Sequence, residues 1–139
     1  MVMLGVDLGL ARTGLAVCDA EEILATPLPQ LDCKGQKLPR IAERIAQVAK
    51  ERDAAQIVLG NPKALDGGTS PMSQRCAAFA KMLAEASALP VVLRDERFSS
   101  RMAEGLLRDA QVFGAQRKSV SDSAAATVIL QEHISSMNN

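Results

Sequence analysis

Carboxylate side chains stand at three points of the chain where they could share one cation. Asp7 closes a short apolar run, Asp95 and Glu96 close another, and Asp122 stands just before a long apolar segment. Clustered carboxylates repel one another and lose hydration, so a protein keeps them together mainly where a cation compensates. Oxygen ligands without His or Cys suit Mg²⁺ or Mn²⁺. Two such ions about 4 Å apart can activate a water and stabilise the leaving oxygen of a phosphodiester.

Each carboxylate also has a simpler structural explanation. Asp7 could accept hydrogen bonds from the backbone amides of the turn at Gly9. Glu96 stands between two arginines and could form a surface ion pair, and Asp122 follows Ser119 at the spacing of a capping box. These explanations are preferred for any one acid alone. Taken together, the coincidence of the acids at one predicted edge of the sheet shifts the balance toward a shared site.

Apolar periodicity predicts the elements that must position these acids. Short apolar runs indicate strands, and apolar residues at three- and four-residue spacing indicate helices. The expected strands are 3–7, 14–18, 23–31, 56–60 and 91–95, and the expected helices are 38–49, 76–86, 103–110 and 124–130. Asp122 then falls in the first turn of the last helix, segment 61–73 is a loop, and the polar tail from Ser135 is frayed.

A three-strand meander followed by two crossover units predicts a mixed sheet flanked by helices. The first strand and the two later ones run parallel, while Pro27 and Pro29 confine the third strand to an edge. Sites in such sheets form at the carboxyl ends of parallel strands. Asp7 and the Asp95-Glu96 pair are therefore expected at one edge, and helix packing could bring Asp122 there.

Composition excludes several classes of protein. The 139 residues fit one domain, and three Phe with no Trp or Tyr argue against modules that stack bases on aromatic platforms. A net charge of zero excludes a polybasic binder, and no apolar run approaches the roughly 20 residues of a membrane span. Cys18, Cys33 and Cys76 lack metal or disulfide spacing and are expected to be small buried residues. A cytoplasmic protein is expected.

Four motifs, in order, resemble the YqgF family, also called RuvX, over almost the whole chain. Its members are described as Holliday junction resolvases and pre-16S rRNA nucleases. The motifs are Val6-Asp7-Leu8-Gly9 with Arg12, Gly14, Ala16 and Asp19; Leu59-Gly60-Asn61-Pro62 with Asp66-Gly67; Asp95-Glu96-Arg97-Phe98-Ser99-Ser100; and Arg117-Lys118 with Asp122 and the segment 124–131. Asn61 departs from the Leu or Tyr that the family often has, and Gly68-Thr69 varies its usual Asp-Gly-Ser. Both departures bear on substrate choice more than on metal binding.

The resemblance implies an RNase H-like fold, with residues 1–139 forming a single nuclease domain. It implies that Asp7, Glu96 and Asp122 are the catalytic acids and the ligands of Mg²⁺ or Mn²⁺. The choice of Glu96 over Asp95 comes from the family, because periodicity shows only that neighbours on a strand face opposite ways.

Basic residues near these acids could bind substrate phosphates without reading base sequence. The best candidates are Arg12, Lys63, Arg97 and Lys118, whereas Arg108 is assigned to a solvated helix face. The loop at Asp66-Gly67-Gly68 could close over substrate or be a simple connection. His133, the only histidine, is expected to be a helix-end residue rather than a metal ligand.

The preferred function is a metal-dependent nuclease that processes the 5′ end of pre-16S ribosomal RNA, with a ribosomal particle as a further partner. A first alternative is a resolvase of four-way DNA junctions, which would act as a symmetric dimer. The sequence leaves open a monomer or a homodimer. A second alternative is a non-catalytic RNA-binding adaptor. A third is nucleotide-dependent phosphotransfer, because Asp7-x-Gly9 resembles the start of the actin, Hsp70 and sugar-kinase superfamily, whose members clamp ATP between two such domains.

Overall fold

The computed structural model describes residues 1–9, 11–61, 71–95 and 114–137, with the backbone alone at 61, 71–73, 95 and 114–122. The strands are β1 (Met3–Asp7), β2 (Arg12–Cys18), β3 (Ala25–Asp32), β4 (Gln56–Asn61) and β5 (Val91–Asp95). The helices are α1 (Leu38–Glu51), α2 (Pro71–Ser87) and α4 (Gly114–Met137). The predicted helix 103–110 and the Asp66-Gly67-Gly68 loop lie outside the described residues.

The five strands form one mixed sheet in the order β3-β2-β1-β4-β5. Strands β1, β2 and β3 make an antiparallel meander, and β4 and β5 run parallel to β1. Pro27 and Pro29 fall on β3, which pairs only with β2 and can therefore accommodate residues that lack a backbone N–H. The expected mixed five-stranded sheet is confirmed.

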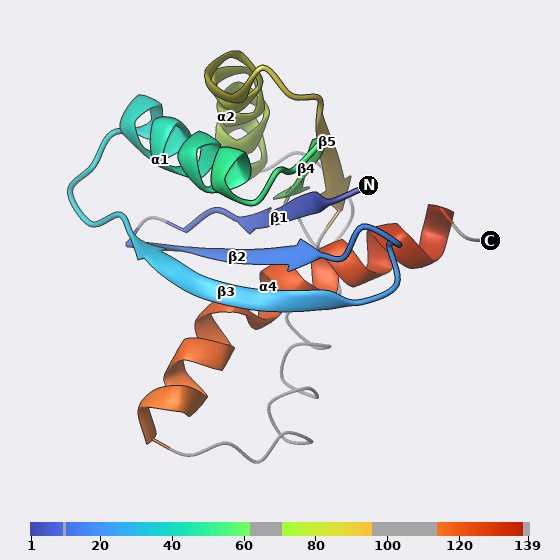
Figure 1. Ribbon diagram of the computed structural model, residues 1–139. Coiled ribbons are helices and arrows are strands. Elements are labelled where there is room, and N and C mark those ends of the chain that lie inside the picture. The colour runs from blue at the N-terminus through green and yellow to red at the C-terminus, as the bar shows by residue number, and fades with distance from the viewer. Residues whose placement is uncertain (10, 62–70, 96–113, 138–139) are drawn as a thin grey trace.

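Helices cover both faces of this sheet, with α1 and α2 on one side and α4 on the other (Figure 1). Successive residues of β1 face opposite sides of the sheet and so belong to different cores. Leu4 and Val6 belong to the core shared with α1 and α2, whereas Met3 belongs to the core shared with α4. A strand that is buried on both faces reads as a continuous apolar run, which explains why β1 was recognisable in the sequence.

Two boundaries differ from expectation. The helix α2 begins at Pro71, so the predicted loop 61–73 was too long at its end. Proline is well suited to the first helical position, because its missing N–H would have no partner there. At the other end of the chain, α4 continues to Met137, so the segment from Ser135 to Met137 is helical rather than frayed.

The start of α4 is a larger correction. The helix begins at Gly114, so Asp122 lies eight residues, or more than two turns, inside it. A capping box at Ser119 is therefore wrong, because that arrangement belongs to a helix start. The segment 114–121 is mostly polar, and its apolar side chains, Ala115 and Val120, do not form a stripe, so hydrophobic periodicity could not detect its helical conformation.

Candidate active site

Asp7 ends β1, the central strand of the sheet, and its side chain is half-buried. The chain then turns back at Gly9 to begin β2 at Arg12. A β-carbon at Gly9 would collide with the carbonyl oxygen of Arg12, so this turn requires glycine. Asp7 is thus held between a rigid strand and a tight turn at the carboxyl edge of the sheet.

The end of β5 reaches the same edge. Val6 of β1 pairs with Leu59 of β4, and Leu59 pairs with Leu93 of β5. Continuing this register by one residue sets Asp7 level with Arg94, and Asp95 follows. Two strand spacings of about 4.8 Å separate β1 from β5, so their ends lie about 10 Å apart. Glu96, the next residue, lies outside the described residues.

Two hydrogen bonds fix the direction of α4 across the sheet. The amide N–H of Ala25 donates to Gln131 Oε1 at 3.0 Å, and Ser123 Oγ donates to the carbonyl oxygen of Leu28 at 2.6 Å. Later residues of β3 therefore meet earlier residues of α4. Because β3 runs in the same direction as β1, α4 runs antiparallel to both strands. Its earlier turns accordingly lie toward the carboxyl end of β1.

The hydrogen bond from Ser123 also shows how far along the strands Asp122 lies. Leu28 pairs with Leu15, and Leu15 pairs with Val6, so Ser123 is bonded to the row of the sheet that contains Val6. The backbone of Asp122, one residue earlier, is therefore at the level of the last residues of β1. The fold brings the end of β1, the end of β5 and this turn of α4 to one edge.

The seven predicted site residues are described to different extents. Asp7 and Arg12 are described in full, and Arg12 is exposed at the first position of β2, beside the turn that follows Asp7. Asp122 and Lys118 are described as backbone within α4. Glu96, Lys63 and Arg97 lie outside the described residues. Among the side chains that are described, no three His, Cys, Asp or Glu residues form a group that could hold a metal ion.

A small cavity beside the Gly9 turn was not anticipated. Its volume is about 300 Å³, and its walls come from the turn after β1, the start of α1 and the first half of α2. The lining residues are Leu8, Gly9, Gln36, Lys37, Leu38, Ile41 and Arg75. Sequence patterns could not reveal it, because Lys37 and Arg75 are far apart in the chain and meet only through the packing of α1 on α2.

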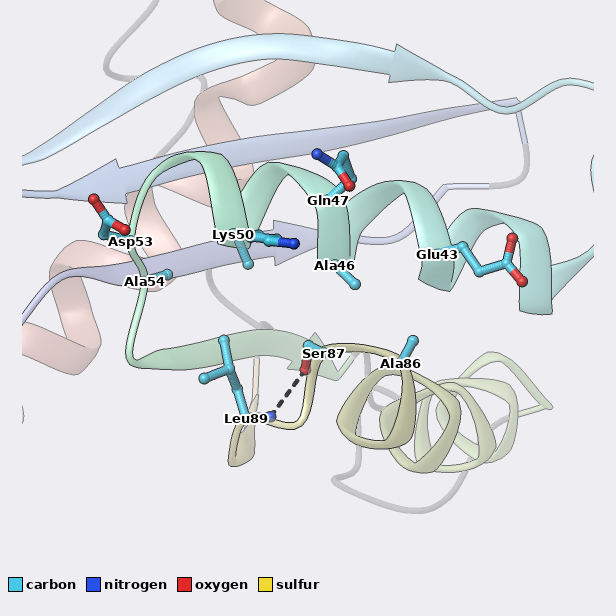
Figure 2. Close-up of a pocket in the computed structure, with 10 residues that line it drawn as sticks. Glu43, Ala46, Gln47, Lys50, Asp53, Ala54, Ala86, Ser87 and Leu89 are labelled. Carbon is cyan, nitrogen blue, oxygen red and sulfur yellow. Dashed lines mark hydrogen bonds between the residues drawn. The ribbon is translucent and has the colours of Figure 1, made fainter.

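A larger cavity lies away from these residues. It is a groove of about 700 Å³ between the C-terminal parts of α1 and α2, lined by Glu43, Ala46, Gln47, Ala49, Lys50, Asp53, Ala54, Ala86, Ser87 and Leu89 (Figure 2). None of the predicted site residues lines it. Helix C-termini carry partial negative charge, so the ends of two helices disfavour a phosphate here.

His133 lies within the last turns of α4, near the helix end where it was expected. It is only 8% exposed, and neither ring nitrogen has a hydrogen-bond partner among the described residues. Burial, with a smaller effect from the nearby Arg94 cation, lowers the pKa of His133 below its ordinary value. The guanidinium of Arg94 itself donates to Ser136 Oγ and to the carbonyl oxygen of Glu132.

The three cysteines are all buried, as expected, and each is a thiol rather than half of a disulfide. Burial raises the pKa of the Cys18 thiol. A buried thiol that is held protonated is a poor nucleophile, so Cys18 contributes packing rather than chemistry. Within the described part of the chain, no helix is long and apolar enough to cross a membrane.

Comparisons with known proteins agree with this architecture. A relative in Streptomyces avermitilis, named "Putative pre-16S rRNA nuclease", is 40% identical over 134 residues, which cover 96% of this chain and 85% of the relative. A relative of the same name in Bacillus thuringiensis is 37% identical over 136 residues, covering 98% of this chain and 99% of the relative.

Solved structures show the same fold. RuvC of T. thermophilus, in complex with a Holliday junction substrate, matches with a TM-score of 0.62 at 16% identity, covering 100% of this chain and 96% of RuvC. The Fowlpox virus resolvase, in complex with Holliday junction DNA, matches with a TM-score of 0.65 at 13% identity over 100% of both chains. This likeness confirms the RNase H-like fold.

The model of the RuvX family, described as Holliday junction resolvase, matches residues 1–136. A match over nearly the full length, together with relatives at close to 40% identity, means that the chain belongs to the RuvX family.

Proposed function

We propose that this protein is a metal-dependent nuclease whose substrate is the 5′ end of precursor 16S ribosomal RNA. The observation that carries the proposal is the meeting of three elements at the carboxyl edge of the sheet: the end of β1, the end of β5 and the turn of α4 that holds Asp122. The names of the full-length relatives supply the RNA substrate. Residues 1–139 would form a single nuclease domain, and such a substrate implies action in the cytoplasm.

The metal ligands in this proposal are Asp7, Glu96 and Asp122. The choice of Glu96 over Asp95 rests on the resemblance to the family's Asp-Glu-Arg motif at Asp95-Glu96-Arg97. Met3 and Gly5 of β1 meet α4, and Asp7 shares their parity. A set of carboxylate oxygens suits Mg²⁺ or Mn²⁺. When bound, such ions would activate a water and stabilise the leaving oxygen of a phosphodiester.

The chain's own residues would position the substrate. Asp7 stands on a strand buried on both faces, and Asp122 stands on a helix anchored to the sheet through Ser123, so both ligands are carried by rigid elements. Because the net charge is zero, phosphate binding depends on local cations. Arg12, Lys63, Arg97 and Lys118 are the proposed phosphate contacts, and contacts of this kind position a nucleic acid without reading its sequence.

A DNA junction resolvase is the second candidate, favoured by the description of the RuvX family and by the fold shared with two resolvases. A junction has two equivalent strands to cut, so a resolvase is expected to act as a symmetric dimer. Sedimentation at working concentration separates the candidates in part, because a strict monomer would weaken the resolvase proposal.

The decisive experiment compares wild type, Asp7→Asn and the control Asp53→Asn. Asp53 undergoes the same chemical change but lines the groove at the C-terminal end of α1, and its left-handed backbone (φ 55°) tolerates Asn. Each protein is incubated with Mg²⁺, with Mn²⁺ or with EDTA. The substrates are a 16S precursor fragment, an immature small ribosomal particle, an unrelated structured RNA and a four-way DNA junction.

Metal-dependent cleavage of the precursor, lost in Asp7→Asn and kept in Asp53→Asn, would support both the nuclease and its site. Cleavage of the junction alone would favour the resolvase. RNA binding without cleavage of any substrate, the particle included, would favour the non-catalytic adaptor and contradict the proposal. Cleavage unchanged in Asp7→Asn would show that the assigned site is wrong.

A further inference from the structure

The cavity beside the Gly9 turn is lined by positively charged side chains. Two of its lining side chains, Lys37 and Arg75, are cationic, and no carboxylate lines it among the described residues. Both cations are exposed, and neither forms an ion pair with a described residue. The neighbouring Arg40, by contrast, is paired with Glu43 at 3.3 Å. Lys37 and Arg75 therefore keep their charge available to an anion.

Gln36 also lines this cavity, and a hydrogen bond holds its side-chain amide in one orientation. Gln36 Oε1 accepts a 2.8 Å hydrogen bond from Arg44 Nη1. The amide oxygen of Gln36 is thereby engaged, so its NH₂ group is the part left to donate to a ligand. The cavity walls thus include an amide donor as well as two cations.

The start of α1 adds to this preference for anions. The N-cap residue Lys37 makes no side-chain hydrogen bond to the first turn, and no acidic residue stands in that turn. The positive end of the helix dipole is therefore not compensated locally. Helix starts of this kind bind phosphate when cations and a cavity accompany them, as they do here.

The place of the cavity connects it to the proposed active site. Gly9 follows Asp7 by only two residues, which is about 7 Å of extended chain. In Figure 1 the end of β1 and the start of α1 both lie toward the left side of the molecule. The cavity opens on the α1–α2 side of the carboxyl edge and Asp7 belongs to the α4 side, so a strand of nucleic acid that crosses the edge of the sheet could place one phosphate at Asp7 and a nearby one in the cavity. Its 300 Å³ is small for a ligand site and suits one phosphate with part of its sugar.

We propose that the cavity formed by Gly9, Gln36, Lys37 and Arg75 binds a backbone phosphate of the nucleic acid substrate close to the bond that is cut. This inference rests on the proposed nuclease function and adds a substrate contact to it. Lys37 and Arg75 are positioning residues here: they hold the strand in register with Asp7 and take no part in the hydrolysis itself.

The test uses two double variants of the full chain that remove the same charge from the same two helices. Lys37→Gln/Arg75→Gln alters the cavity. Lys50→Gln/Lys81→Gln alters exposed lysines of α1 and α2 that do not line it. Binding of a fluorescein-labelled 16S precursor fragment is measured by anisotropy in EDTA over a series of salt concentrations, so that cleavage plays no part.

Loss of two phosphate contacts should weaken binding about tenfold at moderate salt and reduce the slope of log affinity against log salt by about 1.4 to 1.8. The control pair should stay within about twofold of wild type. A third variant, Lys37→Arg/Arg75→Lys, keeps both charges and should recover most of the affinity. Thermal melting checks that all the variants fold alike.

Equal weakening in the two Gln pairs would overturn the proposal, because it would show a general charge effect. Unchanged binding in the cavity variant, or no binding by wild type, would overturn it as well. The same measurements can contradict the nuclease proposal independently of the phosphate site. If wild type binds RNA but cuts nothing while the cavity variant loses affinity, the phosphate site stands without the nuclease. If wild type cuts and the cavity variant keeps its KM, the nuclease stands without the phosphate site.

Discussion

Gly5 of β1 lies directly against Leu130 of α4, so closely that a β-carbon at Gly5 would stand 2.9 Å from Leu130 Cβ and 3.0 Å from the carbonyl oxygen of Ala126. Glycine at this position lets the helix backbone approach the central strand. The approach matters for the site, because Asp7 is two residues along the strand from Gly5 and Asp122 is one helical turn before Ala126. The distance between two proposed metal ligands is thus set by a residue without a side chain.

The variant Gly5→Ala is expected to lower the free energy of unfolding by about 1–3 kcal/mol, the usual cost of overpacking a filled core. Chemical denaturation measures the change. Gly35→Ala is the control, because its β-carbon would meet no atom within 4 Å and only its left-handed backbone (φ 78°) opposes alanine. A smaller loss in Gly5→Ala than in Gly35→Ala would show that β1 and α4 can separate easily.

Ser123→Ala is expected to destabilise the protein by about 1–2 kcal/mol. The substitution removes the buried 2.6 Å hydrogen bond from Ser123 Oγ to the carbonyl oxygen of Leu28. Ser135→Ala is the matched control, because it is the same substitution in the same helix at an exposed position. If both variants melted alike, the anchor between α4 and β3 would be of little energetic value.

Much of the fold could be predicted from the sequence because its elements carry strong patterns. Strand β1 is buried on both faces and reads as an unbroken apolar run, and α1 shows a clear stripe at Ile41, Ala42, Ile45 and Ala49. The polar first turns of α4 show neither pattern. Their helical conformation depends on the chain around them, so the position of Asp122 inside the helix could not be predicted.

The candidate site was predictable only in part, for the same kind of reason. Strand order and the rule on carboxyl ends placed Asp7 and Asp95 at one edge, because both depend on topology alone. The level of Asp122 depends on one hydrogen bond between Ser123 and Leu28, and the cavity depends on how α1 packs on α2. Contacts of that kind are tertiary and leave no local signal in the sequence.

Stability is expected to fall with acidity because of His133. Its folded-state pKa lies below the ordinary value near 6.5, so between these two pKa values the unfolded chain binds a proton that the folded chain does not. The contribution is neutral above about pH 6.5 and becomes destabilising as the pH falls, with a slope of up to about 1.4 kcal/mol per pH unit. Denaturation of wild type and His133→Leu from pH 7.5 to 5 measures it.

In His133→Leu this component of the pH dependence should disappear. The free energy of unfolding of the variant should therefore increase relative to that of wild type as the pH falls. Leucine also removes two buried nitrogens that lack partners among the described residues. Parallel pH curves for the two proteins would contradict the assignment and would indicate that His133 is protonated equally well in both states.

Metal binding should reverse the effect of Asp7 on stability. Without metal, Asp7→Asn removes repulsion between the proposed ligands Asp7, Glu96 and Asp122, so the variant should melt no lower than wild type. With Mg²⁺ at about ten times its dissociation constant, wild type should gain about 1.4 kcal/mol and the variant should gain little. Melting curves in EDTA and over a Mg²⁺ series test both statements, with Asp53→Asn expected to follow wild type. A large loss of stability in EDTA would instead assign Asp7 to the turn at Gly9, because a carboxylate that accepts backbone amides stabilises the fold with or without a metal.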